Sequence, residues 1–324
     1  MKKNIKTLIA TALTVCIFSV PVLAQTVGKV IFEKGDKYTI TYATPDNSNS
    51  KFIDYISSEI LKSNTSNITE VKEAGKNLSE LENSSLYAEY ISFYDIYKSG
   101  DLTSVVTTNY IYTGGAHGLT VLNSYTGFNN SNEILTVDKL FKDGIDGIKI
   151  LKDNINSKID ENASNYFEDA KNTINSKDTF NYYIDGKNIV IYFSPYEIAP
   201  YASGIPKFNI NVDELKDALK PEIYTNIIKG ESLSDVRLNG ESFELSKEII
   251  NEENKTLIPL RAVGEALGLE IGWTPETGAT ISGEKVENVT LIDGVSYVDV
   301  SDNTVFPENV YVNYMPNEGL RLYK

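Results

Sequence analysis

Alternating apolar and polar positions predict strands in the first part of the chain. Residues 30–43 alternate on both sides of a short polar turn, which favours one or two strands. Residues 87–97 and 102–112 flank Lys98-Ser99-Gly100-Asp101, where glycine accepts the positive φ of a hairpin turn. Residues 120–128 continue the pattern, and we expect a third antiparallel strand there.

Apolar positions spaced three and four apart predict helices between and after these strands. Residues 52–60 carry one such pattern, and residues 68–80 carry a second, weaker one. The clearest pattern begins at Ile145 and recurs through Ile159, and it could continue toward Ile174. Residues 137–141 suggest only a short helical turn before it.

A second hairpin follows the long helical pattern. Asp185-Gly186 lies between the apolar runs 180–184 and 188–193, and this dipeptide is a strong signal for a two-residue hairpin turn. A short strand at 208–210 and one or two short helices within 212–228 complete this part. We therefore expect an α+β fold, with helices packed on an antiparallel sheet.

The pattern changes after residues 229–232, which we interpret as a linker. Pro259 can open a helix and Gly268 can end it, because proline suits the first turn and glycine the position past the end. We expect an antiparallel sheet beneath this helix. Its strands are expected at 270–273, 279–282, 296–300 and 310–314. Residues 233–324 therefore predict a small α+β module with one main helix.

The N-terminus predicts export. Lys2, Lys3 and Lys6 precede an apolar run from Leu8 to Val20, and Val22-Leu23-Ala24 suits signal peptidase. Residues 1–24 are therefore expected to be a signal peptide cleaved after Ala24. The alternative is a lipoprotein signal, in which lipid would be attached to Cys16. No later run is long enough for a transmembrane helix, and we expect a secreted or cell-wall-associated protein.

The charge restricts the partners. The chain carries 45 acidic and 30 basic residues, a net charge of −15, and removal of the leader lysines would make it more negative. Nucleic acid and anionic lipid are therefore poor partners, whereas a cationic protein would be attracted. The alternative is that acidity only keeps the protein soluble. The single cysteine, Cys16, would leave with the leader, so we expect no disulfide.

Two unusual loop motifs occur in the first part of the chain. One is Tyr112-Thr113-Gly114-Gly115-Ala116-His117-Gly118, and the other runs from Phe193 to Pro206 and includes Tyr196, Glu197 and Tyr201. Together they resemble the RsiV-like domain of unknown function, which forms the extracellular part of lysozyme-sensing anti-sigma factors and also accompanies peptidoglycan deacetylases. The resemblance assigns residues 85–228 to this domain and residues 25–84 to the α/β segment that precedes it.

The resemblance implies a binding function at these loops. The partner implied is a cationic protein such as lysozyme, and peptidoglycan is the other candidate. The expected partner-binding residues all come from the two motifs: Tyr112, Thr113, Gly114, Gly115, His117, Gly118, Tyr196, Glu197 and Tyr201. Alternatively, the glycines only permit a tight turn that His117 caps, and the prolines and tyrosines only pack the second loop.

The last module has a resemblance of its own. Residues 257–273 read Leu-Ile-Pro-Leu-Arg-Ala-Val-Gly-Glu-Ala-Leu-Gly-Leu-Glu-Ile-Gly-Trp and are similar to the copper amine oxidase N-terminal-like domain, over about residues 233–324. This segment contains no histidine, so it offers copper no imidazole ligand. We expect a spacer or wall-associating module, in which Trp273 belongs to the core and Arg261 forms an ion pair or caps a carbonyl.

The sequence offers few candidate catalytic residues. His117 is the single histidine, whereas zinc hydrolases and deacetylases usually use at least two as ligands, and no nucleophile-elbow sequence accompanies it. We therefore expect no catalytic residues, no metal, no cofactor and no enzymatic activity. Two alternatives remain: a cell-wall hydrolase that uses acidic residues such as Glu197, and a purely structural surface protein.

Overall fold

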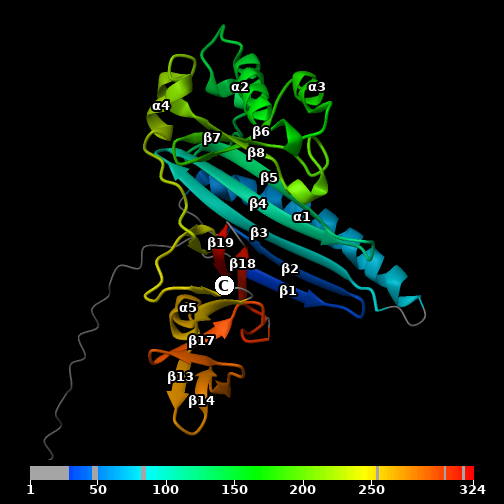
Figure 1. Cartoon of the computed structure of the whole chain (residues 1–324), viewed down its shortest axis with the longest axis vertical. Coiled ribbons are helices and arrows are strands. Elements are labelled where there is room, and N and C mark those ends of the chain that lie inside the picture. Colours follow the sequence, from blue (N-terminus) through cyan, green and yellow to red (C-terminus); the bar gives the residue numbers. More distant parts are fainter. Residues whose placement is uncertain (1–28, 46–49, 82–84, 253–254, 303, 316–317) are drawn as a thin grey trace, which may run out of the picture.

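The computed structural model describes residues 29–45, 50–81, 85–252, 255–302, 304–315 and 318–324. The expected signal peptide, its cleavage site after Ala24 and the alternative at Cys16 lie outside these residues. Figure 1 shows a large part built around a long twisted sheet and a smaller C-terminal module below it. The expected α+β class is confirmed, since sheets of mostly antiparallel strands are covered by a few helices.

The central sheet has five strands in sequence order, and all neighbours are antiparallel except β2 and β3. Its strands are β1 (Lys29–Lys34), β2 (Tyr38–Thr44), β3 (Ala88–Ser99), β4 (Leu102–Tyr112) and β5 (Leu119–Phe128). The predicted hairpin at Gly100 joins β3 to β4, and this glycine has a φ of 60°. Because β2 pairs with β3, the segments on both sides of residue 84 share one sheet.

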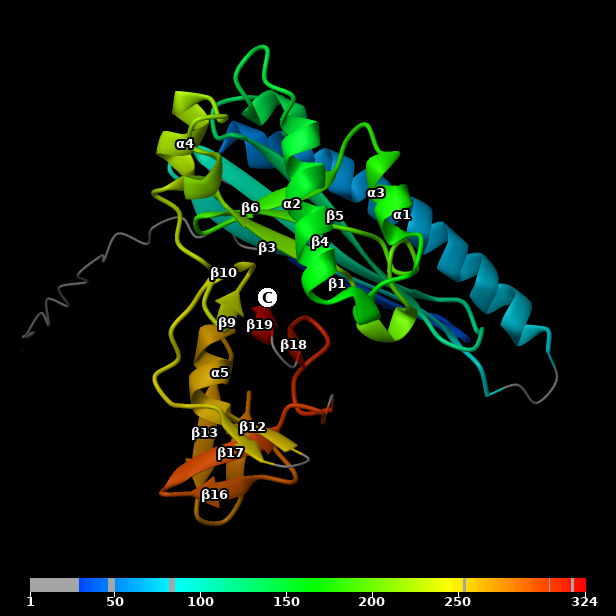
Figure 2. The same ribbon diagram turned by 45° about the horizontal axis from the view of Figure 1, so that its top comes forward.

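A single long helix, α1 (Lys51–Ser79), connects β2 to β3 and runs along the sheet (Figures 1 and 2). The sequence predicted two helices here because the apolar pattern is interrupted at Asn64. In the structure Asn64 is buried on the face toward the sheet, where its side-chain oxygen accepts a hydrogen bond from the Tyr90 hydroxyl at 2.8 Å. A polar residue whose side-chain oxygen is hydrogen-bonded to the sheet therefore takes an inward position within a continuous helix.

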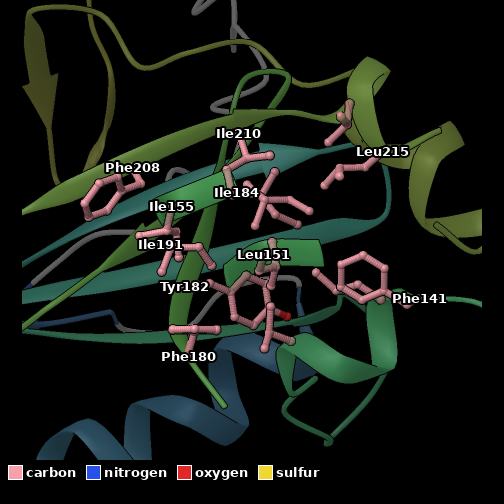
Figure 3. Packing of buried hydrophobic residues seen from close by; sticks show 14 of the residues in the cluster. Phe141, Leu151, Ile155, Phe180, Tyr182, Ile184, Ile191, Phe208, Ile210 and Leu215 are labelled. Atoms are coloured by element: carbon pink, nitrogen blue, oxygen red, sulfur yellow. The ribbon is translucent and has the colours of Figure 1, made fainter. Parts of the chain in front are cut away.

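A second layer packs on strands β3, β4 and β5 of the central sheet. It consists of a three-stranded antiparallel sheet and helices packed around one hydrophobic core, which Figure 3 shows from close by. Its elements are η1 (Val137–Leu140), α2 (Gly147–Glu161), η2 (Ala163–Asn165), α3 (Ala170–Asn175), β6 (Asn181–Asp185), β7 (Asn188–Tyr192), η3 (Tyr201–Ser203), β8 (Lys207–Asn211), η4 (Val212–Leu215) and α4 (Pro221–Ile227). The predicted hairpin at Asp185-Gly186 joins β6 to β7. The helix that could have continued to Ile174 ends at Glu161.

In its described residues, the C-terminal module contains one α-helix and strands in three sheets. Its elements are β9 (Val236–Leu238), β10 (Glu241–Ser242), β11 (Ile250–Glu252), β12 (Lys255–Pro259), α5 (Leu260–Ala266), β13 (Ile271–Thr274), β14 (Gly278–Ile281), β15 (Glu284–Lys285), β16 (Thr290–Ile292), β17 (Val295–Asp299), β18 (Tyr311–Met315) and β19 (Gly319–Tyr323). Pro259 precedes α5 and Gly268, with a φ of 75°, follows it, as predicted. The strands expected beneath this helix, however, are divided among the sheets β10-β9-β19-β18, β11-β12-β17-β16 and β13-β14-β15.

The last strand fixes the module to the central sheet. Arg321 on β19 is 5% exposed and donates from Nη2 to the Asp95 carboxylate on β3 at 2.9 Å. Arg237 on β9 donates to the same carboxylate at 2.7 Å. Beside them, Tyr323 is fully buried and donates its hydroxyl hydrogen bond to the Tyr94 carbonyl. The two parts of the chain therefore share a buried polar and aromatic interface.

Burial and charge act in opposite directions at this interface. Burial alone lowers the pKa of the Arg321 guanidinium, but the Asp95 carboxylate, together with Tyr323 and Glu318, more than offsets this, and the pKa lies above its ordinary value. A buried charge that loses its partner is strongly destabilising, because the remaining charge keeps its desolvation cost. Asp95 pairs with both Arg237 and Arg321, and Glu318 gives Arg321 a second carboxylate partner.

We predict that Asp95→Ala lowers the free energy of unfolding by about 3–5 kcal/mol, because it removes the buried carboxylate that two largely buried guanidinium groups share. The matched control is Lys98→Ala, which removes a solvent-exposed ion pair between the same two parts, from Lys98 on β3 to Glu241 on β10. This control should cost no more than about 1 kcal/mol. Urea denaturation measures both, and equal effects for the two variants would contradict the prediction.

Candidate functional site

The two sequence motifs meet at one end of the fold. Residues 113–118 connect β4 to β5, and residues 193–206 connect β7 to β8. The His117 and Tyr201 rings lie 4.4 Å apart between centroids, and the Tyr201 and Tyr196 rings stack at 5.4 Å. We refer to His117, Tyr196 and Tyr201 as the aromatic cluster. Its members come from segments about 80 residues apart, so the fold, and not local sequence, assembles it.

Hydrogen bonds to one carbonyl hold the cluster together. The Tyr201 hydroxyl donates to the Gly118 carbonyl at 2.8 Å. His117 Nδ1 lies 2.9 Å from the same carbonyl, which can only accept, so we assign the proton of the neutral ring to Nδ1. His117 Nε2 then points toward the Tyr196 hydroxyl at 3.5 Å. The exposed edge of the imidazole is therefore an acceptor.

Gly118 is required at the base of the cluster for steric reasons. It is buried, and a Cβ atom there would lie 2.3 Å from the ring of Tyr110 on β4. Gly114 has a φ of 91°, a conformation that favours glycine. Gly115 has open space around the position of a Cβ atom. The three glycines of the motif therefore serve different purposes.

The first residues of the motif lie beside the cluster. The Tyr112 hydroxyl donates to the Gly115 carbonyl at 3.0 Å, and its ring packs edge-on against Tyr87 at 5.6 Å. Thr113 is exposed. Within the described part of the chain, neither Tyr112 nor Thr113 forms a hydrogen bond or ring contact with the 193–206 loop. The structure thus unites His117, Gly118, Tyr196 and Tyr201 directly and keeps Tyr112 and Thr113 at the edge.

Glu197 braces the second loop. Its carboxylate accepts a hydrogen bond from the Ser194 backbone N–H at 2.8 Å and forms an ion pair with Lys177. Its side chain is 22% exposed. Sequence reasoning missed Lys177, which follows α3 and has no motif around it. The carboxylate that sequence analysis placed at a partner surface therefore already has two partners within the protein.

Tyr196 is the most exposed ring of the cluster and has an unusual backbone. Tyr196 is 53% exposed. Its backbone φ is 65°, in the left-handed region that disfavours residues with a Cβ atom. Such strain persists where the surroundings enforce it, and it is concentrated at functional sites. The Ser194–Glu197 hydrogen bond and the ring stack with Tyr201 enforce it here.

The groups beneath the loops are partly desolvated. Burial raises the pKa of Glu89 on β3, although the Thr39 hydroxyl, 3.3 Å away, opposes this by donating to the carboxylate. The charge of Glu89 in turn raises the pKa of Tyr87. Burial is the main cause of a raised pKa for Tyr110. These phenols therefore remain neutral at physiological pH.

Two further features are absent from the described residues. No group of three or more histidine, cysteine, aspartate or glutamate side chains is placed to hold a metal ion among them. Within the same residues, no helix has both the length and the apolar character needed to cross a membrane.

Three protein families match separate segments of the chain. Residues 31–120 match the family described as deacetylase PdaC, and residues 138–213 match DUF3298, a protein family of unknown function. Residues 237–313 match the copper amine oxidase N-terminal domain. The aromatic cluster thus lies where the first two matches meet, with His117 in one and Tyr196 and Tyr201 in the other.

Individual proteins show the same similarity. The chain is 26% identical over 161 residues to the peptidoglycan-N-acetylmuramic acid deacetylase PdaC of Bacillus subtilis, which covers 48% of this chain and 34% of that protein. The chain therefore spans about a third of the length of this relative. A solved DUF3298 protein from Pseudomonas aeruginosa is 15% identical to this chain with a TM-score of 0.42, and the similarity covers 61% of this chain and 94% of that protein. A member of the same family from Bacteroides fragilis is 20% identical with a TM-score of 0.44, and the similarity covers 60% of this chain and 94% of that protein.

These comparisons support part of the expected architecture. Segments that match cell-envelope families precede one that matches the copper amine oxidase N-terminal domain, in the order that the motifs indicated. The first segment matches PdaC and the second matches DUF3298. The expectation that the chain is not an enzyme is contradicted, because the chain is similar to a peptidoglycan deacetylase. That expectation rested on the scarcity of histidine, which restricts only chemistry that needs imidazole, whereas carboxylates are abundant in this chain.

The strain at Tyr196 leads to a prediction about stability. We expect Tyr196→Gly to be more stable than Tyr196→Ala by about 1 kcal/mol, because only glycine avoids the cost of the left-handed conformation. At ordinary helical positions the order is reversed, and alanine is the more stable by about 0.5–1 kcal/mol. The matched control is the pair Asp153→Gly and Asp153→Ala at an exposed position in α2. Urea denaturation of the four variants would contradict the prediction if both positions favoured alanine.

Proposed function

We propose that this chain is an extracellular protein of the bacterial cell envelope whose aromatic cluster binds a cationic protein such as lysozyme. The observation that carries the proposal is the cluster itself. Two loops from different parts of the chain place three rings in contact and leave Tyr196 about half exposed, on a strained backbone. Tyrosine is enriched in protein interfaces because it combines a large apolar area with a polar hydroxyl.

The rings suit a cationic partner. The face of a tyrosine ring attracts a lysine or arginine side chain by about 0.5–2 kcal/mol, depending on how far the pair is desolvated. Tyr196 and Tyr201 present stacked rings, and the Nε2 atom of His117 adds an acceptor beside them. The net charge of −15 adds a long-range attraction that raises the rate of encounter.

Two kinds of similarity agree with this proposal. The motifs resemble the RsiV-like domain, whose lysozyme-sensing members hold a strongly cationic enzyme outside the cell. The relative from Bacillus subtilis is named for an activity on peptidoglycan, the polymer that lysozyme attacks. Location in the envelope, with the signal peptide removed after Ala24, is part of the proposal.

We predict that Tyr196→Ala weakens binding of the chain to lysozyme at least tenfold, equivalent to about 1.4 kcal/mol, because it removes the exposed ring of the cluster. The control is Trp273→Ala, which removes a ring of similar exposure, 55% against 53%, from the other module. Calorimetric titration at low and at physiological salt measures both. Binding that disappears at physiological salt, or that both variants weaken equally, would reduce the interaction to general charge attraction.

A second function is favoured by the comparison with PdaC, namely an enzymatic action on peptidoglycan. The chain would then release acetate or new reducing ends from purified peptidoglycan, and both products are measurable. If Glu197 acts as the acid or base, Glu197→Gln should lower the rate by about 10²-fold or more, whereas Glu276→Gln in the other module should not. Undiminished turnover by Glu197→Gln would exclude Glu197 from that role, and no turnover by the parent chain would leave the binding function.

A further inference from the structure

A second surface with the character of a binding site lies in the C-terminal module. A cavity of about 490 Å³ opens between the β13–β14 hairpin, the start of α5 and the β16–β17 hairpin, elements that lie together in the module (Figure 2). This volume falls within the range of about 300–1,000 Å³ that is usual for small-ligand sites. We call this cavity the Trp273 groove, and the residues that define its character are Lys247, Arg261, Glu265, Trp273 and Leu291.

Trp273 forms one wall and is not in the core, contrary to the sequence expectation. It is 55% exposed. On β13 it shares a face with Ile271, which packs so closely on α5 that a Cβ atom at Gly264 would lie 2.3 Å from the Ile271 side chain. Trp273 lines the groove together with Arg261 and Glu265 of α5, and its partner across the sheet is the small Ala279. The indole therefore projects beside the helix instead of beneath it.

The hairpin that carries Trp273 is held in shape by its turn. The Thr274 hydroxyl accepts a hydrogen bond from the Thr277 backbone N–H at 3.0 Å, and the two threonine hydroxyls lie 2.7 Å apart. Gly278 supplies a positive φ of 74°. A large exposed ring on a rigid hairpin loses little conformational freedom when it binds a ligand. On the opposite wall, Leu291 is 65% exposed, so the groove has apolar surface on both sides.

The charge of the groove differs from that of the whole protein. Lys247 and Arg261 line it together with one acidic residue, Glu265, whereas the chain has a net charge of −15. Arg261 Nη1 donates to the Ile271 carbonyl at 3.0 Å and lies 3.5 Å from the Glu265 carboxylate. These contacts fix the guanidinium beside the indole and, within the described residues, involve only Nη1. The lining of the groove therefore carries two basic side chains and one acidic one.

We propose that the Trp273 groove binds a carboxylated cell-wall saccharide, of the class in which N-acetylmuramic acid alternates with N-acetylglucosamine. The apolar face of a pyranose ring packs on the indole, and a sugar carboxylate pairs with Arg261, since guanidinium groups bind carboxylates in a forked geometry. Lys247 adds a second cation. This function goes beyond binding of a cationic protein, because it uses another module and a ligand of opposite charge.

The single tryptophan of the chain makes the test direct, because the intrinsic tryptophan emission reports on Trp273 alone. The full mature chain is titrated with a tetrasaccharide that alternates N-acetylglucosamine and N-acetylmuramic acid, and in parallel with neutral chitotetraose. The expected result is a saturable shift of the emission to shorter wavelength, with at least tenfold tighter binding of the acidic saccharide. An unchanged emission with both saccharides, or equal affinity for the two, would overturn the proposal.

Variants separate the parts of the site. Arg261→Ala should lower the affinity for the acidic saccharide to that for chitotetraose, whereas Lys285→Ala, at another exposed cation of the same module, should change neither. By calorimetry, Trp273→Phe should retain part of the binding and Trp273→Ala should lose it, with circular dichroism confirming that both are folded. If Trp273→Ala binds the acidic saccharide as well as the parent does, or if Tyr196→Ala abolishes this binding instead, the groove is not the site.

Discussion

The structure depends on one buried carboxylate, that of Asp95. It lies near the middle of β3, which is itself the central strand of the largest sheet, and it accepts hydrogen bonds from Arg237 and Arg321. Arg321 also donates to Glu318 at 3.0 Å, and Glu318 in turn pairs with Lys207 on β8 at 3.3 Å. Charges of alternating sign therefore connect the central sheet, the C-terminal module and the smaller sheet. Burial of Asp95 and Arg321 is costly, and the cost is offset only while the two keep their partners.

Sequence patterns predicted the elements whose cause is local. The turns at Gly100 and Gly186 require positive φ, and both hairpins occur where glycine supplies it. The parallel pairing of β2 with β3 has no such signal, because α1 separates the two strands and the pairing is decided by the sheet. The same holds for β19, a fully buried strand at the end of the chain that pairs with β9 more than 80 residues earlier. No turn marks that contact in the sequence.

The candidate sites show the same division. The motif residues could be selected because the two loop motifs occur together and resemble a known domain, and the fold brings His117, Tyr196 and Tyr201 into contact. Lys177, which neutralises Glu197, could not be selected, because it is one lysine among many. Trp273 was expected in the core because tryptophan is usually largely buried. It is exposed beside the start of α5, on a sheet of three strands, and only the assembled module shows this arrangement.

The Asp95 network also gives the two surfaces a fixed relation. Modules joined by a flexible linker gain from two weak contacts only to the extent that the linker allows both at once. Here the last strand, β19, is anchored to the central sheet by Arg321 and Tyr323, so the C-terminal module presents the Trp273 groove from a defined position. The ligands proposed for the aromatic cluster and for the groove have opposite charges, and salt would weaken both attractions. A protein held on an anionic polymer by the groove would therefore keep its cluster available to the cationic enzymes that the same polymer attracts.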